Sequence, residues 1–246
     1  MLTLVATLSS YVDTTFDMRT DTPPGRDPDS HSPTLRRYHQ LLWDKPLPNG
    51  RRFELRSDVP GAYLLHESDL GRFRLSSDTI ANSHRKRLSR FYNAMPTGEN
   101  EKFHKLGYTI GGSLVFPGNR VTGHQTINQR RGTHRLIEDR IDLTLDCIRR
   151  HYGKQESPLS ATLALYDDFF ALFDCFEGYV DFFLLQDLIT PHSEVAFFLP
   201  FRDFRPSPLP GDLASYREYR ERTLAFVESR DRRIARLNDS VSLSTP

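Results

Sequence analysis

The chain has 246 residues, of which 37% are hydrophobic and 26% charged, and its formal net charge is +1. This length and composition are typical of a globular protein with a sizeable core, and the small net charge excludes a global field that would attract nucleic acid or an anionic membrane. Two cysteines, Cys147 and Cys175, exclude a disulfide framework and a cysteine-based zinc site. No apolar run reaches the roughly 18 residues that a membrane helix needs. We therefore expect a cytoplasmic protein without membrane contact, in which both cysteines are small core residues.

The chain opens with an apolar segment that is followed by a long loop. Residues 1–12 are expected to form a flexible arm or a first strand. Residues 13–33 contain four prolines and five aspartates, so they cannot continue a helix or a central strand. Because prolines reduce the conformational entropy that is lost on ordering, and because Asp/Arg pairs can hold the chain in place, we expect this loop to be ordered and packed on the body of the protein.

The next part of the sequence is predicted to be rich in short strands. Ser32 and Pro33 are typical of a helix start, and this helix is expected to end at Asp44. Alternating apolar residues, separated by turn residues, then predict an antiparallel meander. Its three strands lie within residues 51–77, a helix follows over 78–92 and a loop over 95–101, and further strands are expected over 107–117 and up to Asn128.

The second half of the chain is predicted to be mainly helical. Apolar side chains recur at helical spacing from about Thr133 to Tyr152, which predicts one long helix. A second helix starts at Ser157, and a charged last helix extends from Gly211 to about Leu237. The apolar segment 179–189 is either a buried helix or a buried strand, and 195–201 is expected to be a strand. Seven apolar residues are expected to share one core: Leu145, Ile148, Phe169, Phe170, Phe173, Phe182 and Leu185.

No internal repeat and no linker divides this series of elements. The sequence therefore predicts a single α+β domain over residues 13–238, with an antiparallel β-rich N-terminal half and a mainly helical C-terminal half. Residues 239–246 are expected to form a disordered tail.

The segment 122–152 has the densest group of cationic side chains in the chain. A helix that begins at Thr133 would present free N–H groups and a partial positive charge directly after Gly132, which lets an anion approach the backbone. The sequence therefore predicts a phosphate-binding site whose residues are Arg19, Asn128, Arg130, Arg131 and Gly132. The alternative is a solvated basic turn whose arginines pair with the nearby carboxylates of Glu138, Asp139 and Asp142.

Three further side chains are candidates for catalysis. His134 can act as a general acid or base when its pKa lies near neutrality. Asp17 and Asp21, in the N-terminal loop, carry the oxygen ligands that Mg²⁺ prefers, although the same carboxylates can instead form loop-internal hydrogen bonds and pairs with arginine. No Walker, HExxH, GxSxG or GxGxxG motif is present, so the sequence requires no cofactor and leaves Mg²⁺ as an open option.

Three passages give the chain its most distinctive signature. They are FDMRTDTPPGRDPDSHSPTLRRYHQLLWDKPLPNG at 16–50, GYTIGGSLVFPGNR with TINQRRG at 107–132, and DRIDLTLDCIRRHY with YVDFFLLQDL at 139–188. In these passages the chain resembles a family of bacterial proteins that is defined only as a domain of unknown function, over about residues 13–236. The resemblance implies a single cytoplasmic bacterial domain and assigns no activity.

Two functions from different classes are compatible with the sequence. The first is a protein that binds phosphate-bearing ligands, a nucleotide or nucleic acid, through a local basic patch, with nuclease-like or nucleotide-processing chemistry as an option. The second is a non-catalytic module that binds a protein partner through the last helix or the aromatic-rich segment 166–204. Convergence of Asp17, Arg19, Asn128 and Arg131 in one cleft would favour the first function.

Overall fold

The computed structural model describes residues 11–81 and 86–243, with side chains described up to residue 238. The arm predicted for residues 1–12 thus lies outside the described residues except at its end. There, Val12 is buried, and its backbone exchanges two hydrogen bonds with the side chain of Asn238. These bonds join the start of the described chain to the end of the last helix.

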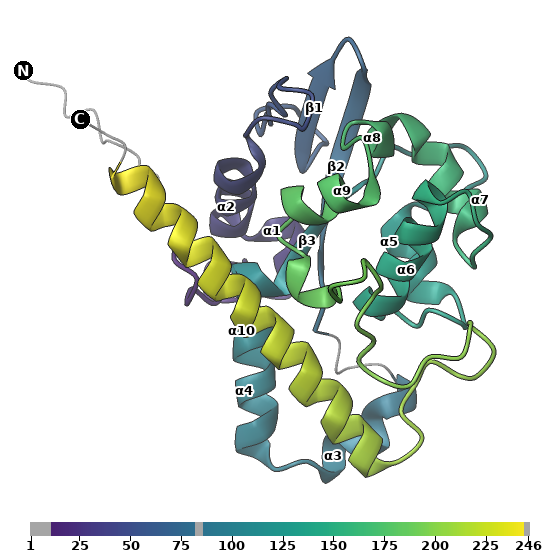
Figure 1. Cartoon of the computed structure of the whole chain (residues 1–246). Coiled ribbons are helices and arrows are strands. Elements are labelled where there is room, and N and C mark those ends of the chain that lie inside the picture. The colour runs from purple at the N-terminus through teal and green to yellow at the C-terminus, as the bar shows by residue number, and fades with distance from the viewer. Residues whose placement is uncertain (1–10, 82–85, 244–246) are drawn as a thin grey trace, which may run out of the picture.

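The described strands form one three-stranded antiparallel sheet with the order β1-β2-β3 (Figure 1). The strands are β1 (Leu64–Ser68), β2 (Gly71–Thr79) and β3 (Ser113–Pro117). β1 pairs with β2 only as far as Leu75, whereas β3 pairs with β2 from Leu75 to Thr79. The last part of β2 is therefore open on the side of β1.

The N-terminal part of the chain packs helices beside this sheet. Ser32 caps the second of them by accepting a hydrogen bond from the Leu35 amide, as its sequence predicted. In chain order these elements are α1 (Pro28–His31), α2 (Pro33–Trp43), the 3₁₀ turn η1 (Lys86–Leu88), α3 (Ser89–Ala94), α4 (Thr97–Gly107) and the 3₁₀ turn η2 (Ile110–Gly112).

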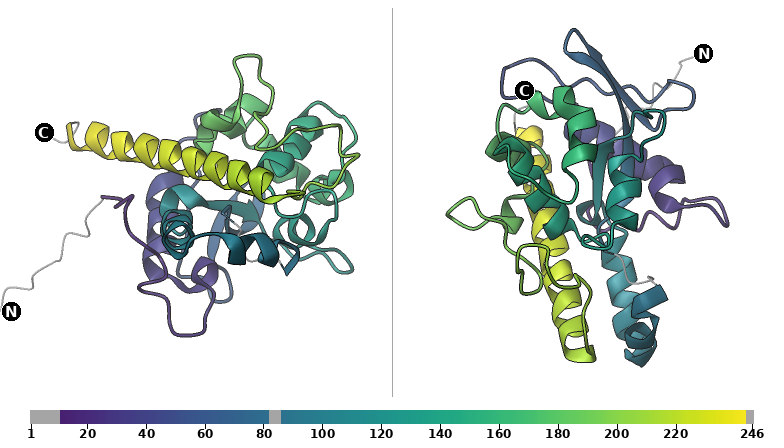
Figure 2. Two further views of the ribbon diagram at one scale, coloured as in Figure 1. Left: turned by 90° about the horizontal axis from the view of Figure 1, so that it is seen from below. Right: turned by 90° about the vertical axis from the view of Figure 1, so that its right-hand side faces the viewer.

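The C-terminal half contains short helices followed by one long helix. In chain order they are α5 (Ile127–Thr133), α6 (Ile141–Tyr152), α7 (Ser160–Leu163), η3 (Ala164–Tyr166), α8 (Asp167–Ala171), α9 (Phe176–Phe182), η4 (Gln186–Leu188) and α10 (Leu213–Leu243). α10 runs along the molecule, and α3 and α4 lie beside its N-terminal part (Figures 1 and 2). Among the described residues, no helix combines the length and apolar character that crossing a bilayer requires.

The glycine pair 111–112 allows α10 to approach the sheet closely. A Cβ atom on Gly111 would lie 2.7 Å from the carbonyl oxygen of Val227 in α10. The amide of Gly111 donates to the Asp231 carboxylate at 2.8 Å. The close backbone approach that this glycine pair indicated is thus made by the last helix.

The predicted fold class is confirmed, since the described strands all lie within residues 64–117 and the rest of the chain is mainly helical. All seven predicted core residues belong to one continuous hydrophobic cluster. A smaller cluster, formed by Leu88, Phe91, Met95 and Tyr216, joins α3 to α10.

Several element boundaries were predicted wrongly. The segment 78–92 starts as the end of β2, and the loop expected at 95–101 falls largely within α4. Residues 51–57 and 195–201 form isolated bridges rather than strands, because Phe53 and Phe198 are buried by aromatic neighbours instead of a continuous ladder. Cys175 is exposed, since its position before α9 makes it the cap of that helix and not a core residue.

The largest boundary error concerns the long helix predicted over 133–152. Residues up to Thr133 belong to α5, and the following helix α6 begins only at Ile141. Between them, Glu138 and Asp139 adopt left-handed backbone angles, with φ of 48° and 67°, which interrupts helical geometry. At the other end of the chain, α10 continues to Leu243, into the range predicted as a tail, and residues 244–246 lie outside the described residues.

The aromatic core generates a test of the packing. Phe173 has no exposed surface and contacts the rings of Phe53, Phe169 and Phe182. Phe173→Ala should lower the free energy of unfolding by about 3–5 kcal/mol, because it removes a buried ring and leaves a cavity. Urea unfolding measures this change, with Leu41→Ala, on the exposed face of α2, as the control. Coincident midpoints for Phe173→Ala and the parent protein would contradict the packing.

Candidate functional site

The carboxylates of the N-terminal loop form ion pairs and hydrogen bonds with other groups of the protein. Asp17 pairs with Arg19 at 2.5 Å. Asp21 accepts hydrogen bonds from Ser32 Oγ at 2.6 Å and from the Thr34 amide at 2.9 Å, which ties the loop to the start of α2. The loop is thus ordered and packed on the body, as predicted.

Two further loop carboxylates complete this attachment. Asp27 caps α1 by accepting from the Asp29 amide. Asp29 itself accepts from the amide and the hydroxyl of Thr79 in β2, at 3.0 and 2.5 Å. In the described parts of the chain, no group of three or more His, Cys, Asp or Glu side chains has an arrangement that could hold a metal ion. The hydrogen bonds of Asp21 and Asp29 give these loop carboxylates a structural role.

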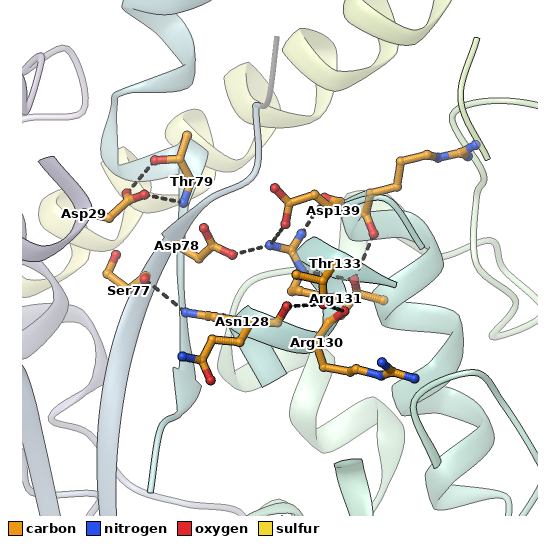
Figure 3. Close-up of polar contacts among 12 residues, drawn as sticks. Asp29, Ser77, Asp78, Thr79, Asn128, Arg130, Arg131, Thr133 and Asp139 are labelled. Atoms are coloured by element: carbon orange, nitrogen blue, oxygen red, sulfur yellow. Dashed lines mark hydrogen bonds and ion pairs between the residues drawn. The ribbon is translucent and has the colours of Figure 1, made fainter. Parts of the chain in front are cut away.

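Arg131, the centre of the predicted phosphate site, is fully buried. Figure 3 shows it between Asp78 and Asp139. Its Nη1 atom contacts the carboxylates of Asp78 and Asp139. Its Nη2 atom donates to the carbonyl oxygen of Asp139 at 2.6 Å, and its Nε atom donates to Thr144 Oγ1 at 3.1 Å. Every nitrogen of the guanidinium thus has a partner inside the protein. Asp139 was among the partners expected in the alternative interpretation. That interpretation also expected a solvated turn, whereas Arg131 is buried, and it did not anticipate Asp78 in β2.

The carboxylates around Arg131 outnumber the positive charges. Burial raises the pKa of Asp78 to about 8; Arg131 opposes this shift, whereas Asp139 and Asp29 add to it. Burial also raises the pKa of Asp29 to about 6, against the hydrogen bonds from Thr79. A proton on Asp78 near neutral pH relieves the repulsion between carboxylates that share one guanidinium.

The remaining residues of the predicted site lie at separate places. Asn128 contacts β2, because its Nδ2 atom donates to Ser76 Oγ at 3.0 Å and to the Ser77 carbonyl at 3.1 Å (Figure 3). Gly132 lies inside α5 and so does not precede a helix start. The anion site that was predicted at a helix N-terminus therefore lacks that helix N-terminus, since α5 ends where it was expected to begin.

His134 and Arg130 are near the surface at the end of α5. His134 caps the helix, and its Nδ1 atom accepts from the Leu136 amide at 3.2 Å. Burial lowers the pKa of His134, and the charges of Arg130 and Arg135 lower it further. Asp17 and Arg19 form no hydrogen bond or ion pair with Asn128 or Arg131 among the described residues, so the predicted set does not form one contact network.

A hollow of about 440 Å³ lies instead at the open edge of β2. We call it the edge pocket. It forms because β1 ends opposite Leu75, so that Ser76 and Ser77 have no neighbouring strand on that side. The amide of Thr79 points to this edge, where it meets Asp29, and strand alternation places the Ser77 amide on the same edge. Its wall also contains Arg36 from α2, Tyr63 before β1 and Ser30 from α1.

Arg36 is the main positive charge of the edge pocket. Its guanidinium lies over the ring of Tyr63, with 5.1 Å between the guanidinium carbon and the ring centroid. No carboxylate forms an ion pair with Arg36 among the described residues. The pocket wall includes one carboxylate, Asp58, and this is paired with Arg56 at 3.2 Å. Among the described residues that line the pocket, Arg36 is therefore the one charged side chain without an ion-pair partner.

Two buried polar atoms next to the serines of the edge pocket lack a hydrogen-bond partner among the described residues. They are the hydroxyl of Tyr63, which lies beside Ser77, and Oδ1 of Asn128, whose Nδ2 atom holds Ser76. Burial raises the pKa of Tyr63 far above its ordinary value, so this phenol stays protonated and available as a donor. Unpaired buried polar groups are uncommon in folded proteins, and these two are among six such side-chain atoms in the described parts of the chain.

A buried chain of hydrogen bonds supports Ser77 from behind. Trp43 Nε1 donates to His39 Nδ1 at 3.0 Å. His39 Nε2 lies 3.2 Å from Ser77 Oγ and 3.1 Å from Ser113 Oγ, and the two hydroxyls are 2.8 Å apart. Because an indole N–H can only donate, Nδ1 of His39 is an acceptor, and the ring proton sits on Nε2. Burial lowers the pKa of His39 to about 3, so the ring is neutral at physiological pH.

The sequence contained little signal for this site. Ser76 and Ser77 are ordinary strand residues, and Arg36 is one of many arginines. The adjacent pair Arg36-Arg37, directly after the Asp-rich loop, is the one local cue that the sequence analysis did not use. The edge itself depends on where β1 ends, which a sequence pattern does not fix.

A family model matches residues 12–234 of this chain. The chain belongs to the family of unknown function DUF6994. The match confirms the resemblance to a domain of unknown function, and it spans both the edge pocket and the Arg131 ion pairs. No curated protein and no solved structure matches the chain. Membership in DUF6994 therefore establishes the family without assigning an activity.

The charge group around Arg131 generates a prediction on stability. The pKa of Asp78 is about 8 in the folded protein, above the ordinary value of 3.8, so the folded state holds a proton that the unfolded state has lost. Stability should therefore decrease as the pH rises from 7 to 8, by about 1 kcal/mol from this group. Asp78→Asn keeps the shape of the side chain but cannot titrate. It should therefore remove this part of the dependence of stability on pH. Parallel stability curves for the two proteins, from urea unfolding, would contradict the raised pKa.

The hydrogen bonds of His39 generate a second prediction. The ring should remain neutral, with its proton on Nε2, throughout the range from pH 5 to pH 8, because burial disfavours the charged form and Trp43 occupies Nδ1. Nitrogen-15 NMR of histidine-labelled protein distinguishes the two tautomers and the cation. A titration of His39 within this range, or a proton on Nδ1, would show that the chain of hydrogen bonds is assigned wrongly.

Proposed function

We propose that this protein binds a small phosphate-bearing ligand of nucleotide size in the edge pocket, and that it does so in the cytoplasm. The observation that carries the proposal is Arg36, a guanidinium without a carboxylate partner among the described residues, at the wall of a hollow of about 440 Å³. A pocket of this volume suits a small organic ligand. Arginine presents a planar set of donors that matches the oxygens of a phosphoryl group.

The groups around Arg36 favour an anion over a neutral ligand. Tyr63 keeps its phenolic proton, and Ser76 accepts from Asn128, which leaves its own hydroxyl proton for another acceptor. The Ser77 amide faces the same edge. Donors thus outnumber free acceptors at this end of the pocket, which is the arrangement that an oxyanion requires.

The proposed function is binding rather than catalysis by Ser77. A serine becomes a nucleophile when an adjacent base takes its proton. His39 is the adjacent ring, but its Nε2 atom carries the proton and its free lone pair is engaged by Trp43. His39 therefore donates to the serines and holds them in place. His134, the catalytic candidate of the sequence analysis, contacts Leu136 at the end of α5 and is not among the residues that line the edge pocket.

The direct test is the binding of nucleoside monophosphates to the wild type and to Arg36→Ala. The wild type should bind at least one of AMP, GMP, CMP and UMP more tightly than the matching nucleoside. Arg36→Ala should weaken that binding at least about tenfold, because a hydrogen bond to a charged group contributes about 1.5–3 kcal/mol. Isothermal titration calorimetry measures both.

Arg74→Ala provides a matched control, because Arg74 is an exposed arginine of β2 that does not line the edge pocket. It removes the same charge and should leave the affinity within about twofold, as expected for a distant, screened charge. Equal losses in the two variants would indicate a diffuse charge effect. If neither these four nucleotides nor their di- and triphosphates bind at about 1 mM, the proposal fails, and the alternative of a non-catalytic protein-interaction module becomes the better account.

A further inference from the structure

A second hollow, of about 290 Å³, lies directly beside the edge pocket along α2. We call it the α2 recess. The two hollows share Arg36 and Ser57, so they meet at these residues. The α2 recess adds Arg37, His31 and Gln40 to the shared wall. A ligand whose phosphoryl group is held at Arg36 can therefore extend from the edge pocket into the recess.

The α2 recess is cationic. Arg36 and Arg37 are adjacent residues of α2, and neither forms an ion pair with a carboxylate in the described parts of the chain. The ring of Tyr38 lies 5.6 Å from the guanidinium carbon of Arg37, and the ring of Tyr63 has the same relation to Arg36. Each arginine thus rests on an aromatic ring, which limits its motion. Arg37 also interacts with the Tyr38 side chain by a hydrogen bond, and a guanidinium has five N–H donors, so further N–H groups remain for a ligand.

One carboxylate, Asp21, is linked by hydrogen bonding to the wall of the recess, and it keeps its charge while accepting from protein donors. Asp21 accepts from Ser32, a residue of the recess wall, and from the Thr34 amide. These two hydrogen bonds satisfy the Asp21 carboxylate within the loop. The positive charges of Arg36 and Arg37 consequently face the recess without a competing anion that needs a partner.

We propose that the ligand of the edge pocket carries a chain of at least two phosphoryl groups, one held at Arg36 and the next at Arg37 in the α2 recess. This inference rests on the proposed function and adds the ligand class: a nucleoside diphosphate or triphosphate, or another polyphosphate ester. A monophosphate fills only the part of the wall at Arg36, whereas a second phosphoryl group meets the second guanidinium. Each added group brings further negative charge and further acceptor oxygens.

The experiment compares ligands that differ only in the number of phosphoryl groups. AMP, ADP and ATP, and separately inorganic phosphate, pyrophosphate and tripolyphosphate, are titrated into the wild type at constant ionic strength by calorimetry. The second series removes any contribution of the base. In both series, the step from one phosphoryl group to two should raise the affinity by about tenfold. GDP, CDP and UDP replace the adenine series if another base binds more tightly.

The variant Arg37→Ala identifies the cause of this increase. It should abolish most of the gain from the second phosphoryl group while leaving the affinity for the monophosphate within about twofold. Arg36→Ala should weaken all members of both series. Arg74→Ala, the exposed control, removes a positive charge that lies outside both hollows. It should therefore leave the ratio of the diphosphate affinity to the monophosphate affinity unchanged.

The outcomes separate this inference from the proposed function. Equal affinities for mono- and diphosphate in the wild type, or an increase that Arg37→Ala leaves intact, overturn the inference while pocket binding at Arg36 stands. The inference is also overturned if Arg74→Ala lowers the ratio of diphosphate to monophosphate affinity as much as Arg37→Ala does. Absence of binding by every member of both series overturns the proposed function itself.

Discussion

The buried guanidinium of Arg131 joins three parts of the chain that are distant in sequence. It connects α5, on which it lies, to Asp78 at the end of β2 and to Asp139 in the turn before α6. A buried charge of this kind is stable only when its partners satisfy it on all sides. The left-handed turn at Glu138 and Asp139 brings both the carboxylate and the carbonyl oxygen of Asp139 to Arg131. These contacts tie the last part of β2 to α5 and to the turn before α6.

The two faces of β2 contact different elements of the fold near its open edge. Ser76 and Asp78 contact α5, through Asn128 and Arg131. The side chains of Ser77 and Thr79 contact the opposite elements, through His39 of α2 and Asp29 of α1, while the Ser77 carbonyl also accepts from Asn128. A strand of alternating residues is thus held from both sides by polar side chains. On its other edge this part of β2 pairs with β3. Because β1 does not extend beyond Leu75, a hollow lined by polar groups remains on the side of β1.

Much of the fold followed from the sequence by itself, because the responsible signals are local. The cap at Ser32 and the proline after it determine the start of α2, and the apolar spacing of 141–152 determines the face that α6 buries. Phe173 and its neighbours are buried because removing the apolar surface of so many aromatic side chains from water is favourable. The family passages, too, are read directly from the sequence. Fold class, core and the ordered Asp-rich loop were therefore predictable.

The tertiary structure alone decided which charges are free. Arg131 and Arg36 are equivalent in a sequence, but Arg131 meets a carboxylate 53 residues away, whereas Arg36 meets none among the described residues. The interruption between α5 and α6 has the same origin, since Asp139 leaves helical geometry to reach Arg131. Periodicity reports which face of a segment is apolar, but it contains no information on partners from other segments. The candidate site at the edge of β2 depends on such partners, and the sequence could not reveal it.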